Sequence, residues 1–178
     1  MKNNSATNKN KSVKLARRVA VFGISAALAL ALSFFESLLP PLFALHPGVK
    51  LGLSNVVTMT CAATFGAPCA IAVSIIKGAF AGLTRGFVAM LMSLIGGLLS
   101  TLVVCLLLKL RLGYLVISVI GAVVHNMAQL MVCAFIVANW GVFIYAPVLM
   151  IFGIIAGCIT GSILCLLTKS KAISRLIN

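Results

Sequence analysis

The sequence has almost no negative charge. Glu36 is the single acidic residue among 178, against fourteen Lys and Arg, and the formal net charge is +13. Enzymes that bind diphosphates through Mg²⁺ hold the metal with clustered carboxylates, and acid–base catalysis by carboxylates commonly uses a pair of them. The GxxxxGK[ST] motif of P-loop ATPases is also missing. We therefore expect that the chain is not an enzyme and that any ATP-dependent step belongs to a partner.

Motifs for metals and cofactors are missing as well. The six cysteines show neither CxxC nor Cys/His spacing, and all of them fall in apolar segments. We interpret them as small packing residues. A metal site at His46 and His125 has no supporting carboxylate or thiolate spacing, so no metal and no cofactor are expected.

Charged residues of either sign are few. Only 8% of the residues are charged and 62% are apolar, whereas soluble domains have about 25% charged and 45–50% apolar residues. Several apolar runs exceed the roughly 18 residues that indicate a membrane span, which predicts an all-α, polytopic membrane bundle of six transmembrane helices. The second and third helices are short, which leaves a re-entrant hairpin as an alternative. The helices are expected at about 19–39, 51–65, 69–83, 87–110, 114–139 and 142–168.

Basic residues lie where membrane topology predicts them. They cluster before the first predicted helix, between the fourth and fifth, and after the sixth, so the positive-inside rule places both termini in the cytoplasm. Lys50, Lys77 and Arg85 then fall in the outer half of the membrane. Anionic lipid headgroups account for the remaining positive charge, so the lipid bilayer is an expected partner and nucleic acid is not. The predicted parts are a disordered basic tail at 1–16, a six-helix domain at 17–168 and a basic tail at 169–178.

A set of polar residues within or beside the apolar segments forms the predicted substrate site. Ionisable and amide side chains at membrane depth are costly and indicate function. Glu36 can neutralise only one of the three outer cations, so a small anionic ligand is the expected counter-charge for the others. The alternatives are an internal ion pair of Glu36 with Lys77 or Lys50 and, for the amides, hydrogen bonds between helices. The set is Glu36, Lys50, Asn55, Lys77, Arg85, His125, Asn126 and Gln129.

The stretch HPGVKLGLSN at 46–55 is expected to cap this site on the outer face, with Pro47 and Gly48 shaping the cap. Hydroxyl side chains beside the site are interpreted differently, because Ser and Thr in membrane helices commonly bond the backbone of their own helix or a neighbouring group. This interpretation applies to Ser54, Thr58 and Ser118.

Two ridges of small residues have a period of four, which lets helices approach closely. Each ridge is expected either to pack within the bundle or, in the first helix, to dock a partner membrane protein. The ridge of the first predicted helix contains two runs, Ala16 with Ala20 and Gly23 with Ala27 and Ala31, and the ridge of the last contains Gly153, Gly157 and Gly161.

Two motifs resemble a known family. PGVKLGLSN at 47–55 and GAVVHNMAQL at 121–130 resemble the bacterial Gx transporter family, which is also called heptaprenyl diphosphate synthase component I, and the likeness covers about 17–167. That family is similar to S components of energy-coupling factor (ECF) transporters. The resemblance implies an S-component-like bundle in the bacterial cell membrane that binds a vitamin-like molecule under the loop after the first helix. It further implies docking, through the first-helix ridge, onto an ECF coupling protein that carries two ATPases.

Three functions are compatible with these features. The first is a substrate-binding subunit that takes up a small anionic or vitamin-like molecule, with energy from partner ATPases. The alternative is a noncatalytic membrane component associated with heptaprenyl diphosphate or menaquinone synthesis. The third, a solitary ion-coupled carrier, is disfavoured because few membrane acids are present to relay protons.

Overall fold

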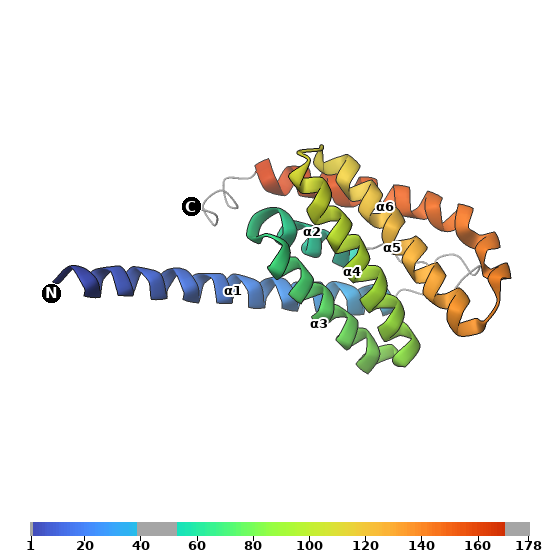
Figure 1. Ribbon diagram of the computed structural model, residues 1–178, viewed down its shortest axis with the longest axis horizontal. Coiled ribbons are helices and arrows are strands. Elements are labelled where there is room, and N and C mark those ends of the chain that lie inside the picture. Colours follow the sequence, from blue (N-terminus) through green and yellow to red (C-terminus); the bar gives the residue numbers. More distant parts are fainter. Residues whose placement is uncertain (1, 39–52, 170–178) are drawn as a thin grey trace.

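The protein is a bundle of helices (Figure 1). The computed structural model describes residues 2–38 and 53–169, and within these ranges it contains no strand. The predicted all-α fold is therefore confirmed. The elements are α1 (Lys2–Leu38), α2 (Leu53–Phe65), α3 (Ala67–Arg85), α4 (Phe87–Lys109), α5 (Tyr114–Val137), the 3₁₀ helix η1 (Trp140–Tyr145) and α6 (Ala146–Lys169).

Neighbouring helices in the chain pack against one another from α3 to α6. The pairs α3–α4, α4–α5 and α5–α6 are antiparallel hairpins with short connections, and α1 packs against α2 and α3 (Figure 1). Tight turns separate α2 from α3 and α3 from α4 at Gly66 and Gly86, whose φ angles are 85° and 91°. Side chains other than glycine rarely adopt these angles, so the two glycines fix the ends of α3.

Five of the six described α-helices are long and apolar enough to cross a membrane, and α2 is the exception. Its thirteen residues span about 20 Å, less than the roughly 30 Å of a bilayer core. Six helices were predicted to span the membrane, and five of the described helices can do so. Residues 51 and 52, the start of the predicted second helix, lie outside the described residues. α2 contacts α1, α3, α4 and α6, so it lies inside the bundle.

The first helix is longer than the sequence predicts. α1 begins at Lys2, and its N-terminal half projects beyond the other helices (Figure 1). The structure thus extends the helix through 2–16, where a disordered tail was expected. Lys, Ala and Ser are compatible with helix, so the apolar half of α1 can propagate its backbone hydrogen bonding into this segment.

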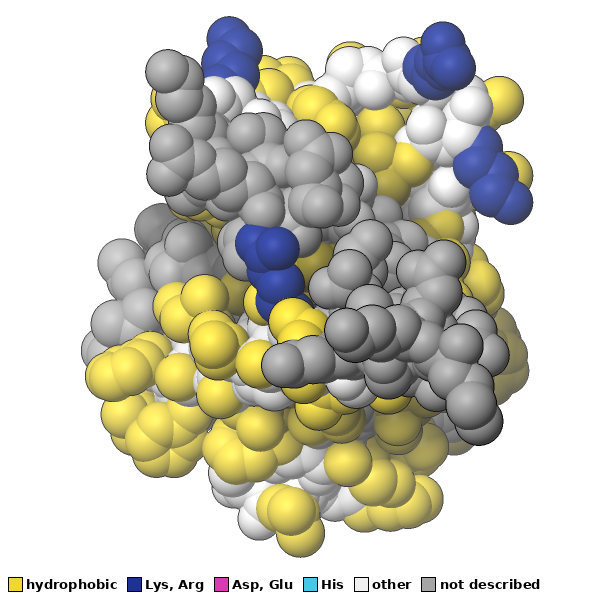
Figure 2. Space-filling model, turned by 90° about the vertical axis from the view of Figure 1, so that its left-hand side faces the viewer, with side chains coloured by type: hydrophobic (Ala, Val, Ile, Leu, Met, Phe, Trp, Pro, Cys, Tyr) yellow, Lys and Arg dark blue, Asp and Glu magenta, His cyan; other side chains and the backbone are white. Residues whose placement is uncertain are grey.

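The surface is that of a membrane protein. Large apolar side chains are exposed on every long helix, for example Ile24, Leu106 and Ile155. Lys and Arg side chains gather at the end from which the N-terminal half of α1 projects, as Figure 2 shows in a view onto that end. The exposed cations among the described side chains are Arg17, Lys109, Arg111 and Lys169.

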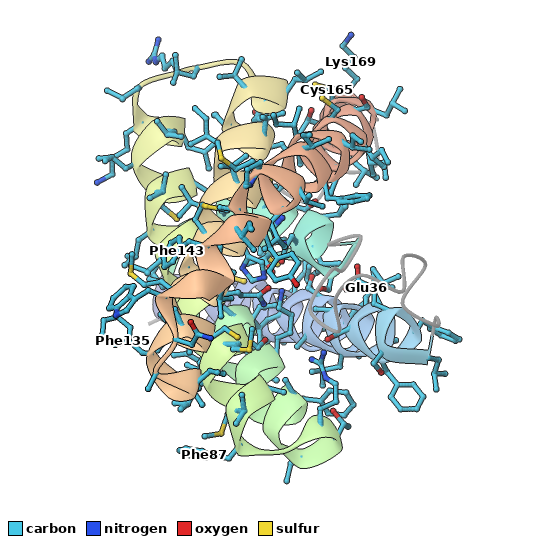
Figure 3. The ribbon with its side chains drawn as sticks, turned by 90° about the vertical axis from the view of Figure 1, so that its right-hand side faces the viewer. Glu36, Phe87, Phe135, Phe143, Cys165 and Lys169 are labelled. Atoms are coloured by element: carbon cyan, nitrogen blue, oxygen red, sulfur yellow. The ribbon has the colours of Figure 1, made fainter. Side chains whose placement is uncertain are left out.

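Aromatic side chains mark the opposite end of α5 and α6. The Trp140 ring lies edge-on to Phe135 and stacks on Phe143, at centroid distances of 5.4 and 6.0 Å. Figure 3 shows Phe135 and Phe143 at the edge of the bundle. The Trp140 ring is amphipathic, and Trp at such a position is typical of a membrane interface.

Candidate small-molecule site

A polar cavity lies between the helices, although most of the chain is apolar. All six α-helices contribute to its wall, and sixteen of its twenty-three lining residues are polar or charged. Polar groups at this depth of a membrane bundle are costly, which makes this cavity the candidate binding site. The polar lining residues are Ser33, Glu36, Ser54, Asn55, Thr58, Ser74, Lys77, Arg85, Ser93, Ser100, Thr101, Ser118, His125, Asn126, Gln129 and Thr160.

Lys77 is the central cation of this cavity. It is 4% exposed, and its Nζ donates hydrogen bonds to Asn55 Oδ1 at 2.6 Å and to Ser54 Oγ at 3.3 Å. Ser54 Oγ in turn donates to Glu36 Oε2 at 3.3 Å. The Ser54 hydroxyl thus connects the cation of α3 with the carboxylate of α1, and the expected relation between Lys77 and Glu36 is mediated by a third side chain.

Ser54 and Thr58 agree with the two forms of the prediction, a bond to a neighbour and a bond within the helix. Thr58 Oγ1 bonds the Ser54 carbonyl at 3.4 Å, within its own helix. Ser54 instead bonds across to two other helices, because two charged groups compete with its own backbone for the hydroxyl.

Arg85 lies eight residues after Lys77 on α3 and lines the same cavity. Its Nε atom is buried and has no hydrogen-bond partner among the described residues. A guanidinium has five donors in a fixed plane and suits carboxylate or phosphate groups. Arg85 therefore adds a second cation with unused donor capacity to the wall of the cavity.

The α5 residues of the predicted site divide into two groups. Asn126 Nδ2 donates to the Leu149 carbonyl of α6 at 3.0 Å, so the expected hydrogen bond between helices is present there. His125 is buried, and its Nδ1 atom has no hydrogen-bond partner within the described part of the chain. Gln129 lines the cavity and packs on Gly96, where a Cβ would lie 2.9 Å from Gln129 Cγ.

Seven of the eight predicted substrate-site residues line this cavity, and Lys50 lies outside the described residues. His46, Pro47 and Gly48 of the predicted cap also lie outside them. Figure 3 labels Glu36, the lining carboxylate of α1. The structure thus brings together, from four helices, residues that sequence reasoning grouped by their cost at membrane depth.

The hydroxyl lining is the part that the predicted site lacked. Lining residues on α4 begin at Ser93 and fall at offsets 0, 4, 7, 8 and 11, and those on α5 begin at Ser118 and fall at the same offsets and at 3. This spacing marks one helix face and is the sequence signal that could have identified the lining. Ser118 was instead expected to bond its own helix or a neighbour, and this prediction is wrong, because its buried hydroxyl has no partner in the described ranges.

Glycines keep this cavity open. A Cβ on Gly97 would lie 2.5 Å from Ser74 Oγ, and one on Gly121 would lie 2.7 Å from Val104 Cγ2. All four residues line the cavity. Larger side chains at the two glycines would therefore narrow it.

The two small-residue ridges have different surroundings. The α6 ridge packs on α5, since a Cβ on Gly157 would lie 2.5 Å from Val119 Cα. The α1 ridge is exposed, and a Cβ on Gly23 would meet nothing within 4 Å. Its role in docking stays a prediction. The exposed ridge residues are Ala16, Ala20, Gly23, Ala27 and Ala31.

Comparison with known protein families assigns the bundle. The family described as heptaprenyl diphosphate synthase component I matches residues 25–167. The chain belongs to the heptaprenyl diphosphate synthase component I family. The match extends from the bundled half of α1 almost to the end of α6 and confirms the family resemblance carried by the two motifs. Neither the curated proteins nor the solved structures provide a match, and the likeness to ECF S components stays a prediction.

The side chains of this component I cavity limit its chemistry. Within residues 2–38 and 53–169, no group of three or more His, Cys, Asp or Glu could hold a metal ion. The cavity offers two cations, one carboxylate, a histidine, amides and hydroxyls. These groups can hold and orient an anion that bears hydrogen-bonding groups.

Proposed function

We propose that this component I family member is a noncatalytic membrane subunit that binds a small anionic molecule in the cavity between its helices. The observation that carries the proposal is the placement of Lys77 and Arg85 on one cavity wall with Glu36 as the single carboxylate. One carboxylate balances one of the two cations, so one positive charge is left. An uncompensated charge at membrane depth is costly, and a bound anion would remove that cost.

The family supports one context for this binding. Its name points to a component of heptaprenyl diphosphate synthesis, so the anion would be the diphosphate group of a prenyl compound and the partner a catalytic prenyl synthase subunit. The chain would then present or position its ligand. The Mg²⁺ chemistry of diphosphates would belong to that partner, because this chain has one acidic residue.

The cavity supports uptake as a second context. Its wall is polar from α1 to α6, and its cations lie on the half predicted to be outer. In this context a polar or vitamin-like anion would enter from outside a bacterial cell, and both termini would be cytoplasmic. The exposed α1 ridge would dock a coupling protein with ATPases.

Anion binding is tested on the full-length protein in lipid nanodiscs. Inorganic diphosphate, phosphate and acetate are titrated while the unfolding temperature is measured. We expect at least one anion to raise the unfolding temperature of the wild type and of Lys109→Met, an exposed cation outside the cavity, but not that of Lys77→Met. Equal shifts in Lys77→Met and the wild type would refute the proposal.

The context is tested by native mass spectrometry of complexes purified from their own membranes. Copurification of a prenyl synthase subunit would support the first context. Copurification of a coupling protein and ATPases would support the second. The same spectra give the mass of any retained small molecule.

A further inference from the structure

Three buried hydroxyls in the cavity wall have no hydrogen-bond partner within residues 2–38 and 53–169. They belong to Ser74 of α3, Thr101 of α4 and Ser118 of α5, which are 0%, 3% and 1% exposed. None of their hydroxyl oxygens makes a hydrogen bond to any described residue. All three line the cavity.

Hydroxyls on the neighbouring helices α2 and α6 bond the backbone of their own helix. Thr60 bonds the carbonyl of Val56 at 2.8 Å, and Thr160, which also lines the cavity, bonds that of Ala156 at 2.8 Å. This is the usual arrangement for Ser and Thr in membrane helices. The three unpartnered hydroxyls do not make this bond to their own backbone, and burial of a hydroxyl without a partner costs free energy.

The three hydroxyls share one end of the cavity. α3 begins, α4 ends and α5 begins at the same end of the bundle, and each hydroxyl lies in the half of its helix nearer that end. Arg85 and Gln129 lie eleven residues beyond Ser74 and Ser118, about 16 Å along the helix axes. The three unpartnered hydroxyls therefore lie towards one end of the cavity, which we call the hydroxyl end, and Arg85 and Gln129 lie towards the other, with Lys77 one turn beyond Ser74 between them.

We propose that this hydroxyl end is a second subsite, which binds the uncharged, hydrogen-bonding body of the anion whose charged group lies at Lys77 and Arg85. The proposal rests on the proposed function and specifies its ligand class. The ligand is a small phosphate or carboxylate with a polar body, such as a polyol or a heterocycle. A hydroxyl both donates and accepts, so three of them can satisfy several groups of such a body.

A prenyl or alkyl chain does not fit this subsite chemically. It would cover the three hydroxyls without offering a hydrogen bond, and each would stay buried and unpaired. If the charged group belongs to a prenyl diphosphate, its chain must therefore lie outside the hydroxyl end.

The test compares phosphate monoesters that share one charged group. Glycerol 3-phosphate, glucose 6-phosphate and pyridoxal 5′-phosphate have polar bodies, and hexyl phosphate has an apolar one. Their affinities are measured for the full-length protein in nanodiscs, with inorganic diphosphate as the anion that has no body. The test variant combines Ser74→Ala, Thr101→Val and Ser118→Ala, and the control is Thr60→Val, outside the cavity.

We expect at least one polar ester to bind the wild type and the control at least tenfold more tightly than hexyl phosphate does. The triple variant should lose that advantage but bind inorganic diphosphate as the wild type does. Without added anion, its unfolding temperature should equal or exceed that of the wild type, because unpaired hydroxyls have been removed. A stabilising structural role for the hydroxyls would instead lower it.

Two results overturn the proposal. One is tight binding of hexyl phosphate that equals or exceeds that of every polar ester. The other is an unchanged preference for a polar ester in the triple variant. If diphosphate binding is normal in either case, the subsite fails while the proposed function stands. If no anion binds the wild type, both fail together.

Discussion

Lys77 of α3 donates a 2.6 Å hydrogen bond to the side-chain oxygen of Asn55 on α2. The amide therefore holds the buried cation without neutralising it. A carboxylate at position 55 would have paired the charge and closed the site to anions. The choice of amide keeps the cation oriented and still able to attract a ligand.

Asn55→Asp tests this relationship. The new carboxylate would accept the same hydrogen bond and form an ion pair, so the unfolding temperature should stay equal or rise. Anion affinity should fall at least tenfold, about 1.4 kcal/mol, because the positive charge is now compensated. Thermal unfolding of wild type and variant without anion measures the first effect, and titration of both with diphosphate measures the second. A variant that binds as well as the wild type would contradict the role given to Lys77.

Glu36→Gln should have the opposite effect on binding. The substitution removes the single carboxylate of the cavity and leaves both cations uncompensated. Affinity for an anion should rise by about tenfold, since a negative charge a few ångströms from the ligand is lost. Isothermal titration calorimetry of the protein in nanodiscs measures the affinity. Unchanged affinity would show that Glu36 does not act on the ligand.

Two glycine substitutions should separate binding from packing. Gly97→Ala places a methyl group near the rotatable Ser74 hydroxyl, so it should weaken ligand binding with little loss of stability. Gly157→Ala forces a methyl group against the α5 backbone at Val119 and should destabilise the bundle by about 1–3 kcal/mol. Unfolding in mixed detergent micelles measures the second effect. The reverse pattern would contradict the cavity described above.

Asn126→Leu should affect the bundle rather than the ligand. Its hydrogen bond to the Leu149 carbonyl joins α5 to α6, and such bonds in membranes contribute about 0.6–2 kcal/mol. We expect a corresponding loss of stability and an anion affinity within about threefold of the wild type. A larger loss of affinity would show that Asn126 contacts the ligand.

Gly23→Leu tests the exposed α1 ridge. The position has open space around it, so the bulky side chain should leave both stability and anion affinity unchanged. If the ridge docks a partner, the variant should lose the copurifying subunit because close helix approach is blocked. Leu28→Ala, at an exposed α1 position outside the ridge, serves as the matched control. Equal recovery of a partner with both variants would exclude docking through this ridge.

The sequence predicts the helices well because membrane spans are long and apolar, and Gly, Pro and basic residues mark their ends. It also identifies the cations and amides of the cavity, since such residues are rare in membrane helices. The sequence alone therefore identifies three of the cavity residues individually, namely Lys77, Arg85 and His125. The structure places all three in the wall of one cavity.

Other features depend on packing that a single sequence does not display. The link from Lys77 through Ser54 to Glu36 needs three helices at a specific register. Whether a hydroxyl bonds its own backbone or faces a cavity is decided by its rotamer and neighbours, so Ser118 could not be separated from Thr58. The length of α1 depends on how far the helix propagates into its polar N-terminal residues, and the pattern of apolar residues does not predict this.

The spacing of the two cavity cations has a mechanical consequence. Lys77 and Arg85 belong to one α-helix, so their backbones stay about 12 Å apart whenever the helix remains intact. Gly66 and Gly86 lie at the two ends of α3. A tilt of α3 would carry both cations together relative to α2 and break the bond of Lys77 to Asn55, so the grip on an anion would loosen in one movement without any change in the distance between the two backbone positions.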